Sequence, residues 1–303
     1  MTRLVHIGDS IDRLQAHDRQ LLAHPRDLAM ARGSAPLEDL DAVVVDCTDG
    51  LSLDLHVLRS MLAEGTTLVV CDRKHLPAGV LVPLAGTWNH TEVLHQQIEM
   101  SEPRKKRAWQ QLVQAKIRAQ AANVISGPDR AKLKMLAAAV RSGDRGNAEA
   151  VAAKLYWAAT FDGGFRRTMR TNEAENGALN YGYAVARALL ARSVVGVGLN
   201  PALGFFHRSR QNPFCLVDDL IEPIRPAVDA IVLRNRAAIQ ESVDIRSALV
   251  AVMSRPFRCA EKRGPLNHVA DHYALSVKRY VSGDIENIDI PVVDDDPNSW
   301  TDE

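Results

Sequence analysis

The 303-residue sequence has little of several features that mark specialised classes of protein. Its four cysteines are far apart and form no CxxC pair or Cys/His cluster, so a structural zinc site is excluded and buried, reduced thiols are the simplest interpretation. Lysine and arginine together number 37, as do aspartate and glutamate, so the chain lacks the net positive charge typical of nucleic-acid-binding proteins. Any contact with nucleic acid must come from local basic patches.

Long hydrophobic runs, glycine and proline are also scarce. The N-terminus has no apolar signal-peptide core, and the most apolar stretch, residues 184–206, is interrupted by Arg187, Arg192 and Pro201. With 18 glycines, 14 prolines and 46% hydrophobic residues, the composition is that of a folded globular chain and not of a low-complexity one. We therefore expect a soluble, cytoplasmic protein of one or two domains that does not enter a membrane.

The first hundred residues contain the short β-branched segments typical of strands. Residues 42–46 and 66–71 predict two buried strands, and residues 4–7 and 27–31 predict two more. Between the first pair, residues 51–64 predict a helix, which gives a β–α–β unit. The apolar face of this helix would carry four leucines: Leu51, Leu55, Leu58 and Leu62.

From about residue 93 the hydrophobic period becomes helical and stays so almost to residue 283. We therefore predict an α+β protein, with a strand-rich domain over residues 1–95 and a larger all-α domain over residues 96–283. Residues 101–120 hold six basic side chains against one acid, with Trp109 among them, and predict a basic helix.

The C-terminal end has the opposite charge. Residues 284–303 carry eight acids and no lysine or arginine, so we expect a solvated acidic tail. Its apolar positions are scattered and predict no core element. The alternative is that residues 288–293 form an extended strand that docks on a partner.

Glu149 is the first candidate for chemistry. Asn147 can cap the helix that follows, which places Glu149 in the first turn, where the helix dipole favours a carboxylate. Capping by itself would explain a glutamate here. The Ala-rich sequence after it predicts close packing, in which a lone charge would need a partner.

The second candidate is His207, which follows a helix stop at Asn200-Pro201 and two aromatics. Such a histidine is often a packing residue, but Asp219 and Glu222 follow within fifteen positions and would share a face of a helix. Pro223 predicts a kink at that point. Acids at a helix N-terminus are the plain alternative for this cluster.

A glutamate, a histidine and a second carboxylate can together hold Mg²⁺ or Mn²⁺. Zinc is also possible for these ligand types, although the HExxH spacing of zinc peptidases is absent. The spacing leaves open whether Glu149, 58 positions before His207, meets the other two residues.

Several sequence blocks together resemble a known family, the CRISPR-associated integrases ("Cas one") that insert new spacers into a repeat array. In the helical half the resemblance rests on NAEAVAAKLYW, LNYGYA, GLNPALGFFH and DLIEPIRP, at residues 147–157, 179–184, 198–207 and 219–226. In the first half it rests on residues 41–45 and 70–77, and on Trp109 in its basic helix. The blocks cover nearly the whole chain in the family's order.

The resemblance implies an N-terminal β-sandwich-like dimerisation domain and a C-terminal helical catalytic domain. It implies that Glu149, His207 and Glu222 are catalytic metal ligands for Mg²⁺ or Mn²⁺, with Asp219 as an auxiliary acid beside them. The reaction would be attack of a DNA 3′-hydroxyl on a phosphodiester, and hydrolysis of branched DNA when water replaces the hydroxyl.

The resemblance also implies partners. These are double-stranded DNA (protospacer and CRISPR repeat), a second copy of the chain in a homodimer, and the small CRISPR-associated protein "Cas two". The sequence most resembles family members that accompany a single-protein RNA-guided effector nuclease, which makes that nuclease a further candidate partner.

Five basic residues are candidate DNA-phosphate contacts, with ordinary surface charge as the alternative: Arg104, Lys105, Arg166, Arg167 and Arg170. Two other functions compete with the integrase. One is a catalytically silent DNA-binding subunit of the same fold, against which the complete ligand set argues. The other is a hydrolase of small phosphoesters, against which the basic helix argues because it favours a long anionic substrate.

Overall fold

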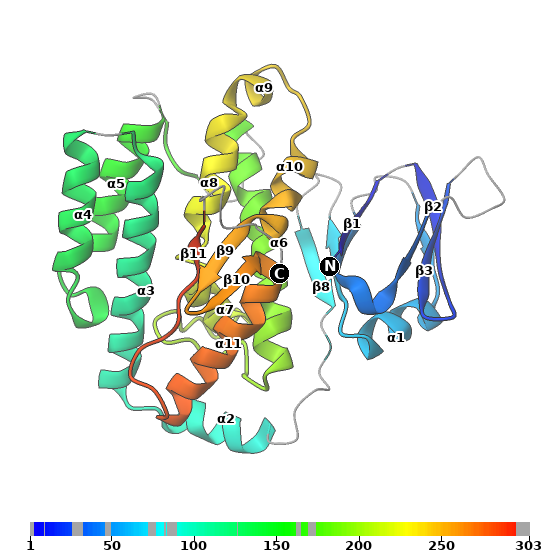
Figure 1. Cartoon of the computed structure of the whole chain (residues 1–303), viewed down its shortest axis with the longest axis horizontal. Coiled ribbons are helices and arrows are strands. Elements are labelled where there is room, and N and C mark those ends of the chain that lie inside the picture. The colour runs from blue at the N-terminus through cyan, green and yellow to red at the C-terminus, as the bar shows by residue number, and fades with distance from the viewer. Residues whose placement is uncertain are drawn as a thin grey trace.

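The computed structural model comprises a strand-rich N-terminal region and a larger helical region (Figure 1). The residues that it describes are 3–8, 10–25, 33–45, 50–71, 77–81, 83, 90–125, 127–161, 165–168 and 174–294. None of the helices in this described part is long and apolar enough to cross a membrane.

The N-terminal region contains two four-stranded sheets. One has the order β1-β5-β7-β8, in which β8 alone is antiparallel, and consists of β1 (Arg3–Ile7), β5 (Leu40–Val45), β7 (Thr67–Cys71) and β8 (Pro77–Leu81). The other has the order β4-β3-β2-β6 and consists of β4 (Gly33–Pro36), β3 (Gln20–Pro25), β2 (Ile11–His17) and β6 (Ser52–Leu53). Both sheets contribute to one hydrophobic cluster, which includes Ile7, Leu14 and Val43. The predicted strand-rich N-terminal region is confirmed.

The predicted β–α–β unit is confirmed, because β5 and β7 pair in parallel and α1 (Leu55–Ala63) connects them. The predicted apolar face of this helix is only partly correct, because Leu51 and Leu58 pack against the core but Leu55 does not. Asp54 caps the helix by accepting from the Val57 N–H at 2.9 Å, so the helix begins four residues later than predicted. Val57 and Met61 are then buried, while Leu55 is 58% exposed. The strand expected at 27–31 lies outside the described residues.

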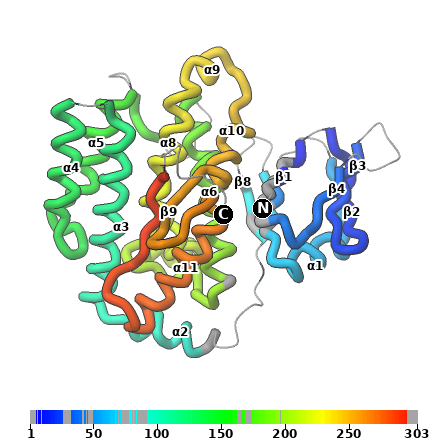
Figure 2. Tube along the Cα trace, in the orientation of Figure 1, coloured from blue at the N-terminus to red at the C-terminus, as the bar shows by residue number. Residues whose placement is uncertain are grey.

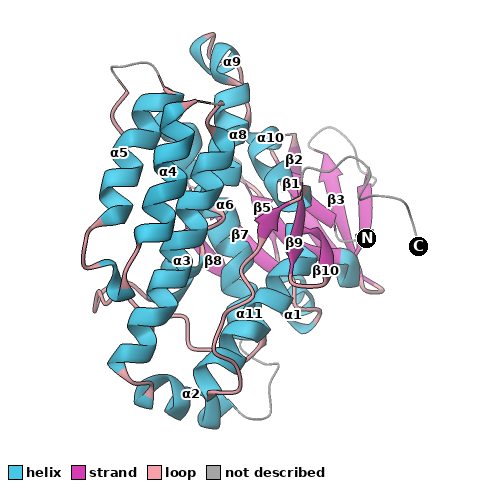
Figure 3. Cartoon of the chain, turned by 60° about the vertical axis from the view of Figure 1, so that its left-hand side comes forward, coloured by secondary structure: helices cyan, strands magenta, loops and turns pink. Residues whose placement is uncertain are grey.

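The helical region packs around α6, which runs through its centre beside β7 and β8 of the N-terminal region (Figure 1). The described helices are α2 (His90–Glu99), α3 (Glu102–Asn123), α4 (Pro128–Ala139), α5 (Ala148–Thr160), α6 (Ala174–Gly196), α7 (Cys215–Leu220), α8 (Arg225–Arg234), α9 (Arg236–Gln240), α10 (Arg246–Val250) and α11 (Leu266–Ser282). Helices α3, α4 and α5 form a layer of their own on one side (Figure 3). The predicted basic helix is α3, whose Trp109 is buried.

The expectation of an all-α second domain was wrong in one respect. It contains two strands, β9 (Pro256–Cys259) and β10 (Lys262–Pro265), which form a three-stranded antiparallel sheet with β11 (Val292–Val293) from the predicted tail, in the order β10-β9-β11. Its strands have two to four residues, too few for the alternation that identifies a strand in a sequence.

The expectation of a solvated acidic tail was wrong for residues 284–294, which pack along α3 and α11 (Figure 2). Ile288 is only 6% exposed, and its N–H donates to Gln111 Oε1 at 2.8 Å. The alternative, a strand within residues 288–293 that docks on a partner, is also contradicted, because Val292–Val293 pairs with β9 of the same chain. The apolar residues at 285, 288, 290 and 293 all face the core, which explains why an acidic segment folds here. Residues 295–303 lie outside the described part.

Ile288→Ala is expected to lower the free energy of unfolding by about 2–5 kcal/mol, the usual cost of emptying a buried isoleucine site. The control is Val292→Ala in the same segment, because Val292 is 53% exposed and its truncation should change stability by no more than about 0.5 kcal/mol. Denaturant titration of both variants measures the difference. Equal effects would mean that the segment does not pack against the core in solution.

Candidate active site

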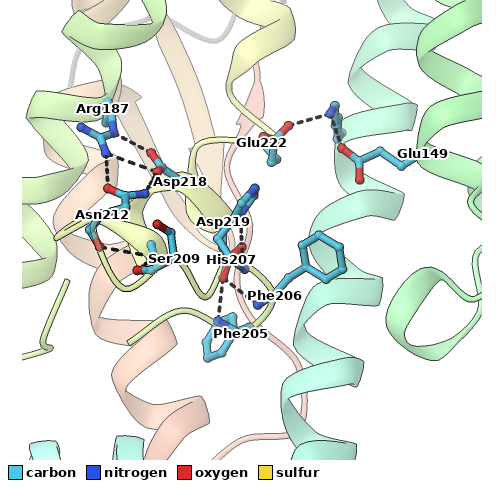
Figure 4. A network of polar contacts seen from close by, with 12 residues as sticks. Glu149, Arg187, Phe205, Phe206, His207, Ser209, Asn212, Asp218, Asp219 and Glu222 are labelled. Atoms are coloured by element: carbon cyan, nitrogen blue, oxygen red, sulfur yellow. Dashed lines mark hydrogen bonds and ion pairs between the residues drawn. The ribbon is translucent and has the colours of Figure 1, made fainter. Parts of the chain in front are cut away.

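The centre of the site is a largely buried lysine held between two glutamates. The Lys116 Nζ atom, on α3, lies 2.6 Å from Glu149 Oε1 and 2.6 Å from Glu222 Oε2. Figure 4 shows the two carboxylates approaching from opposite sides. The Lys116 side chain is 12% exposed and that of Glu222 is 6% exposed. Burial alone would lower the pKa of Lys116, but the charges of Glu222 and Glu149 outweigh it and raise the pKa above its ordinary value.

Glu149 stands in the first turn of α5, as predicted, but the capping residue is different. Asn147 has a left-handed backbone, with φ at 53°, and its side chain makes no capping hydrogen bond. Asp144 supplies the cap, because its two carboxylate oxygens accept from the N–H groups of Ala148 and Glu149 at 2.8 and 3.0 Å. The Glu149 carboxylate is therefore not used for capping and faces Lys116.

Glu222 lies at the predicted kink. Helix α7 ends at Leu220 and α8 begins at Arg225, so Glu222 occupies the turn between them, next to Pro223. Arg225 Nε lies 3.2 Å from Glu222 Oε1. Burial alone would raise the pKa of Glu222, but the positive charges of Arg225 and Lys116 outweigh it and hold the pKa below its ordinary value. Glu222 is therefore a carboxylate, available to bind a cation.

Asp219 is completely buried and organises the loop that carries His207. Its carboxylate accepts the backbone N–H groups of Phe205, Phe206 and His207, at 2.6, 3.0 and 3.1 Å. Gly204 is needed at the start of this turn, because a Cβ atom there would lie 2.9 Å from Asp219 Oδ2 and 2.5 Å from the His207 carbonyl oxygen. The buried Asp219 carboxylate thus fixes the conformation of the loop.

Asp219 also orients the His207 ring, since its Oδ1 lies 2.6 Å from His207 Nδ1. This hydrogen bond raises the pKa of His207 above its ordinary value, against the opposing effect of partial burial. With Nδ1 engaged by the carboxylate, Nε2 is the nitrogen left to bind a ligand. A carboxylate behind an imidazole in this way is the usual support of a metal-binding histidine.

Asp219→Asn is expected to lower the pKa of His207 toward 6.5, its ordinary value, as measured by NMR titration of the ring. In the unchanged protein the folded state binds the imidazole proton more tightly than the unfolded state. The pair therefore stabilises the fold fully below pH 6.5, and this contribution is lost as the pH rises through the raised pKa. An unaltered His207 pKa in the variant would contradict the pairing.

The predicted ligands are partly brought together. Glu149 and Glu222 meet at one cation, and His207 stands on the neighbouring loop (Figure 4). Across the described ranges, however, no three His, Cys, Asp or Glu side chains converge closely enough to hold a metal ion as they stand. Lys116 occupies the space between the two glutamates. The donor set itself, two carboxylates and an imidazole with a free nitrogen, suits Mg²⁺ or Mn²⁺.

Lys116 was missed as a site residue by sequence reasoning, which counted it only among the charges of the basic helix. A signal was present. The buried residues Trp109, Leu112 and Val113 define the inner face of α3, and Lys116 falls on that face at positions i+7, i+4 and i+3 from them. A lysine at such a position needs a buried acidic partner.

A cavity of about 1330 Å³ opens beside His207. Its lining includes Arg166 and Arg167, two of the predicted phosphate contacts, together with Arg187 and Arg225, which the sequence did not single out. Arg187 is held by Asp218 at 2.5 Å. The cavity is thus a positively charged recess next to the glutamates.

The other predicted phosphate contacts are placed differently. Arg104 donates to the carbonyl oxygens of Tyr280 and Ile285 at 2.9 and 2.5 Å, so its guanidinium anchors the C-terminal segment. Lys105 is 19% exposed and lies 3.8 Å from Glu102. Arg170 lies outside the described residues. The structure therefore brings two of the five predicted basic residues to the cavity.

Comparisons with known proteins agree on one family. The family model described as CRISPR associated protein Cas1 matches residues 6–248. A CRISPR-associated endonuclease Cas1 from Neisseria meningitidis is 44% identical over 203 residues, which cover 66% of this chain and 66% of that protein.

Two solved structures show the same fold at low sequence identity. A casposase bound to integration product superimposes with a TM-score of 0.76 at 16% identity, and the match covers 96% of this chain and 93% of the casposase chain. A Cas6-RT-Cas1–Cas2 complex contains a chain that matches with a TM-score of 0.71 at 16% identity, over 96% of this chain and 36% of that one.

Proposed function

The chain belongs to the Cas1 family of CRISPR-associated proteins, and from that premise we propose that it is a metal-dependent DNA integrase and endonuclease that inserts spacer DNA into a repeat array. The observation that carries the proposal is the pair Glu149 and Glu222 around the Lys116 ammonium, beside His207 and an arginine-lined cavity. A hydrolase of small molecules would not need so large a basic recess.

Glu149, Glu222 and His207 Nε2 would hold the metal ion, Mg²⁺ or Mn²⁺. When bound, the ion would polarise the attacked phosphoryl oxygen and stabilise the leaving oxygen. The lysine ammonium between the two glutamates shows that this space attracts and accommodates a cation. For Glu149 and Glu222 to hold a metal ion together, the Lys116 ammonium would have to leave the space between them.

The chain's own residues then position the DNA. Arg166 and Arg167 line the cavity where phosphates flanking the reactive one would lie. Asp219 holds the His207 ring in place from behind. In strand transfer the DNA 3′-hydroxyl forms a new phosphodiester bond and the 3′-oxygen of the cut repeat leaves with the proton, so the number of phosphodiester bonds is unchanged. With water as the nucleophile the same site would hydrolyse DNA.

The proposed partners follow from the family and from the similar structures. One of these is a Cas1–Cas2 complex and another holds integration product, so we propose Cas2 and double-stranded DNA as partners of this chain. A homodimer through the N-terminal sheets is part of the same proposal. On sequence resemblance alone, we also propose that this chain belongs to a system with a single-protein RNA-guided effector nuclease. A contact between the chain and that nuclease is part of this proposal.

The test is an integration assay. A labelled DNA duplex, a plasmid with a leader and repeat, and the full-length chain are incubated with Mg²⁺, Mn²⁺ or EDTA, with and without Cas2. We expect covalent transfer of label to the plasmid with either metal and none in EDTA. Transfer that persists in EDTA would remove the metal from the mechanism.

The rival function is a DNA-binding assembly subunit without catalysis. One observation favours it, since Lys116 fills the position between the two candidate ligands. Titration with Mn²⁺, followed by the electron paramagnetic resonance signal of the free ion, separates the two functions. An integrase should bind Mn²⁺ and transfer strands, whereas a silent subunit should bind DNA and do neither.

A further inference from the structure

Asp229 is a buried acid that the proposed metal site does not use. It lies on α8 and is 1% exposed. Among the residues that the structure describes, the other buried acidic side chains are Asp219 and Glu222, which both belong to the site. Taking a carboxylate out of water is costly unless hydrogen-bond donors replace the water. The contacts of Asp229 therefore indicate why it is buried.

Two tyrosine side chains lie beside the Asp229 carboxylate. The Tyr183 hydroxyl, from α6, donates to Asp229 Oδ1. Tyr156, from α5, lies on the same carboxylate, and its hydroxyl accepts from Asn123 Nδ2 at 2.9 Å. Burial raises the pKa of Asp229 to about 7, although the hydrogen bonds of the two tyrosines oppose the rise. The carboxylate thus connects α8 with α5 and α6.

The two tyrosines differ in what their rings contact. The Arg225 guanidinium lies over the Tyr183 ring, with Cζ 4.8 Å from the ring centroid. A cation over an aromatic face is attracted by the quadrupole of the ring. The Tyr156 ring packs against the Trp157 ring at a centroid distance of 4.9 Å. Through Tyr183, Asp229 is therefore connected to a charged residue of the candidate site.

Arg225 and Lys116 pair with different oxygens of Glu222. Arg225 Nε lies 3.2 Å from Oε1, and Lys116 Nζ lies 2.6 Å from Oε2. Because Oε1 is paired with the arginine, Oε2 is the oxygen that faces the space shared with Glu149. A metal ion in that space would need the same orientation of the carboxylate, since ligand oxygens must lie at fixed distances from the ion.

We propose that Asp229 is a positioning residue that orients the Glu222 carboxylate toward the metal position. Its hydrogen bond fixes the Tyr183 ring, and this ring supports the guanidinium that pairs with Glu222 Oε1. The inference rests on the proposed metal-binding function of Glu222 and adds to it a chain of supporting contacts that begins at a buried acid. The alternative is that Asp229 serves only to join the helices.

The first test needs no metal. Denaturant titration in EDTA measures the stability of Tyr183→Phe, Glu222→Gln and the double variant, because phenylalanine keeps the ring and lacks only the hydroxyl that reaches Asp229. If that hydroxyl acts through Arg225, its removal should cause a smaller loss in Glu222→Gln than in the unchanged chain, since the ion pair it supports is already broken. Additive losses would overturn the proposal.

The second test measures Mn²⁺ affinity from the electron paramagnetic resonance signal of the free ion. DNA is left out because Arg167, a proposed DNA contact, also lies over the Tyr183 ring, at 5.3 Å. Tyr183→Phe should weaken Mn²⁺ binding on the order of tenfold, the lower end of the effect of changing a group that supports a metal ligand.

The matched control is Tyr156→Phe, which removes the other hydroxyl beside Asp229 from a ring that packs against Trp157. It should lose stability and keep the Mn²⁺ affinity of the unchanged chain. Equal weakening of Mn²⁺ binding by Tyr183→Phe and Tyr156→Phe, or none by either, would give both hydroxyls a purely structural role and overturn the proposal.

Asp229 itself is tested with one conservative and one disruptive change. Asp229→Asn keeps an oxygen that can accept from the Tyr183 hydroxyl, so it should bind Mn²⁺ more tightly than Tyr183→Phe does. Asp229→Leu has a similar size and no acceptor, so its Mn²⁺ affinity should fall as far as that of Tyr183→Phe. An asparagine variant as weak as the leucine variant would contradict a role through this hydrogen bond.

Failure of the unchanged chain to bind Mn²⁺ would overturn the proposed metal function of Glu222. The coupling between Tyr183→Phe and Glu222→Gln in EDTA would then decide alone whether Asp229 orients that carboxylate. The two proposals therefore fail by different measurements.

Discussion

Glu149→Gln and Glu222→Gln are each expected to reduce strand transfer on the order of a thousandfold or more. Each change replaces a carboxylate by a neutral amide at the position that would hold the metal ion, and Lewis-acid stabilisation is worth several kcal/mol in the transition state. The measurement is the rate of label transfer to a repeat-containing plasmid in saturating Mn²⁺. His207→Ala should have the same effect through loss of Nε2.

The control for these exchanges is Glu241→Gln, because Glu241 is exposed and lies outside the site. It should transfer strands at the rate of the unchanged chain. Mn²⁺ affinity is measured on the same samples, and we expect it to fall for Glu149→Gln, Glu222→Gln and His207→Ala but not for Glu241→Gln. A variant that keeps Mn²⁺ affinity and transfer rate would show that its glutamate is not a ligand.

Lys116→Met is expected to lower the free energy of unfolding in EDTA by about 3–5 kcal/mol. The change leaves the buried Glu222 without one of its two cationic neighbours and brings two carboxylates face to face, and breaking a buried pair from one side has this cost. In saturating Mn²⁺ the loss should shrink, because the metal ion replaces the missing ammonium. Denaturant titration under both conditions gives the two values.

The control for Lys116 is Lys105→Met on the same helix. Lys105 faces Glu102, whose side chain is 50% exposed, and such surface pairs contribute no more than about 1 kcal/mol. Its stability relative to the unchanged chain should be nearly the same in EDTA and in Mn²⁺, because its metal site is intact. An equal loss for Lys116→Met in EDTA and in Mn²⁺ would show that Lys116 and the metal do not share one position.

The two predictions also separate the roles of the three charges. If the glutamates bind a metal ion in the position that Lys116 otherwise fills, the glutamate variants lose metal affinity, whereas Lys116→Met gains it. If all three form only a structural ion cluster, every variant loses stability and Mn²⁺ makes no difference. The Mn²⁺ titration and the denaturant titration together distinguish the two outcomes.

The sequence by itself determined the elements that depend on neighbouring residues. The β-branched runs became β5 and β7, the helical period from residue 93 became the helical region, and Pro223 broke the helix between α7 and α8. The blocks around Glu149, His207 and Glu222 identified the family, which the comparisons show. In each case the information lies within a few residues, where periodicity and backbone constraint operate.

Only the tertiary structure decided which distant groups meet. Lys116 lies between Glu149 and Glu222, which are 33 and 106 positions further along the chain, and no local pattern encodes that contact. The acidic segment 284–294 folds because Arg104 and Gln111 on α3 satisfy its backbone, and Arg104 is thereby turned away from the surface. Burial and charge pairing are properties of the assembled core, so a lysine or arginine that looks solvated in the sequence becomes structural once packing supplies its partners.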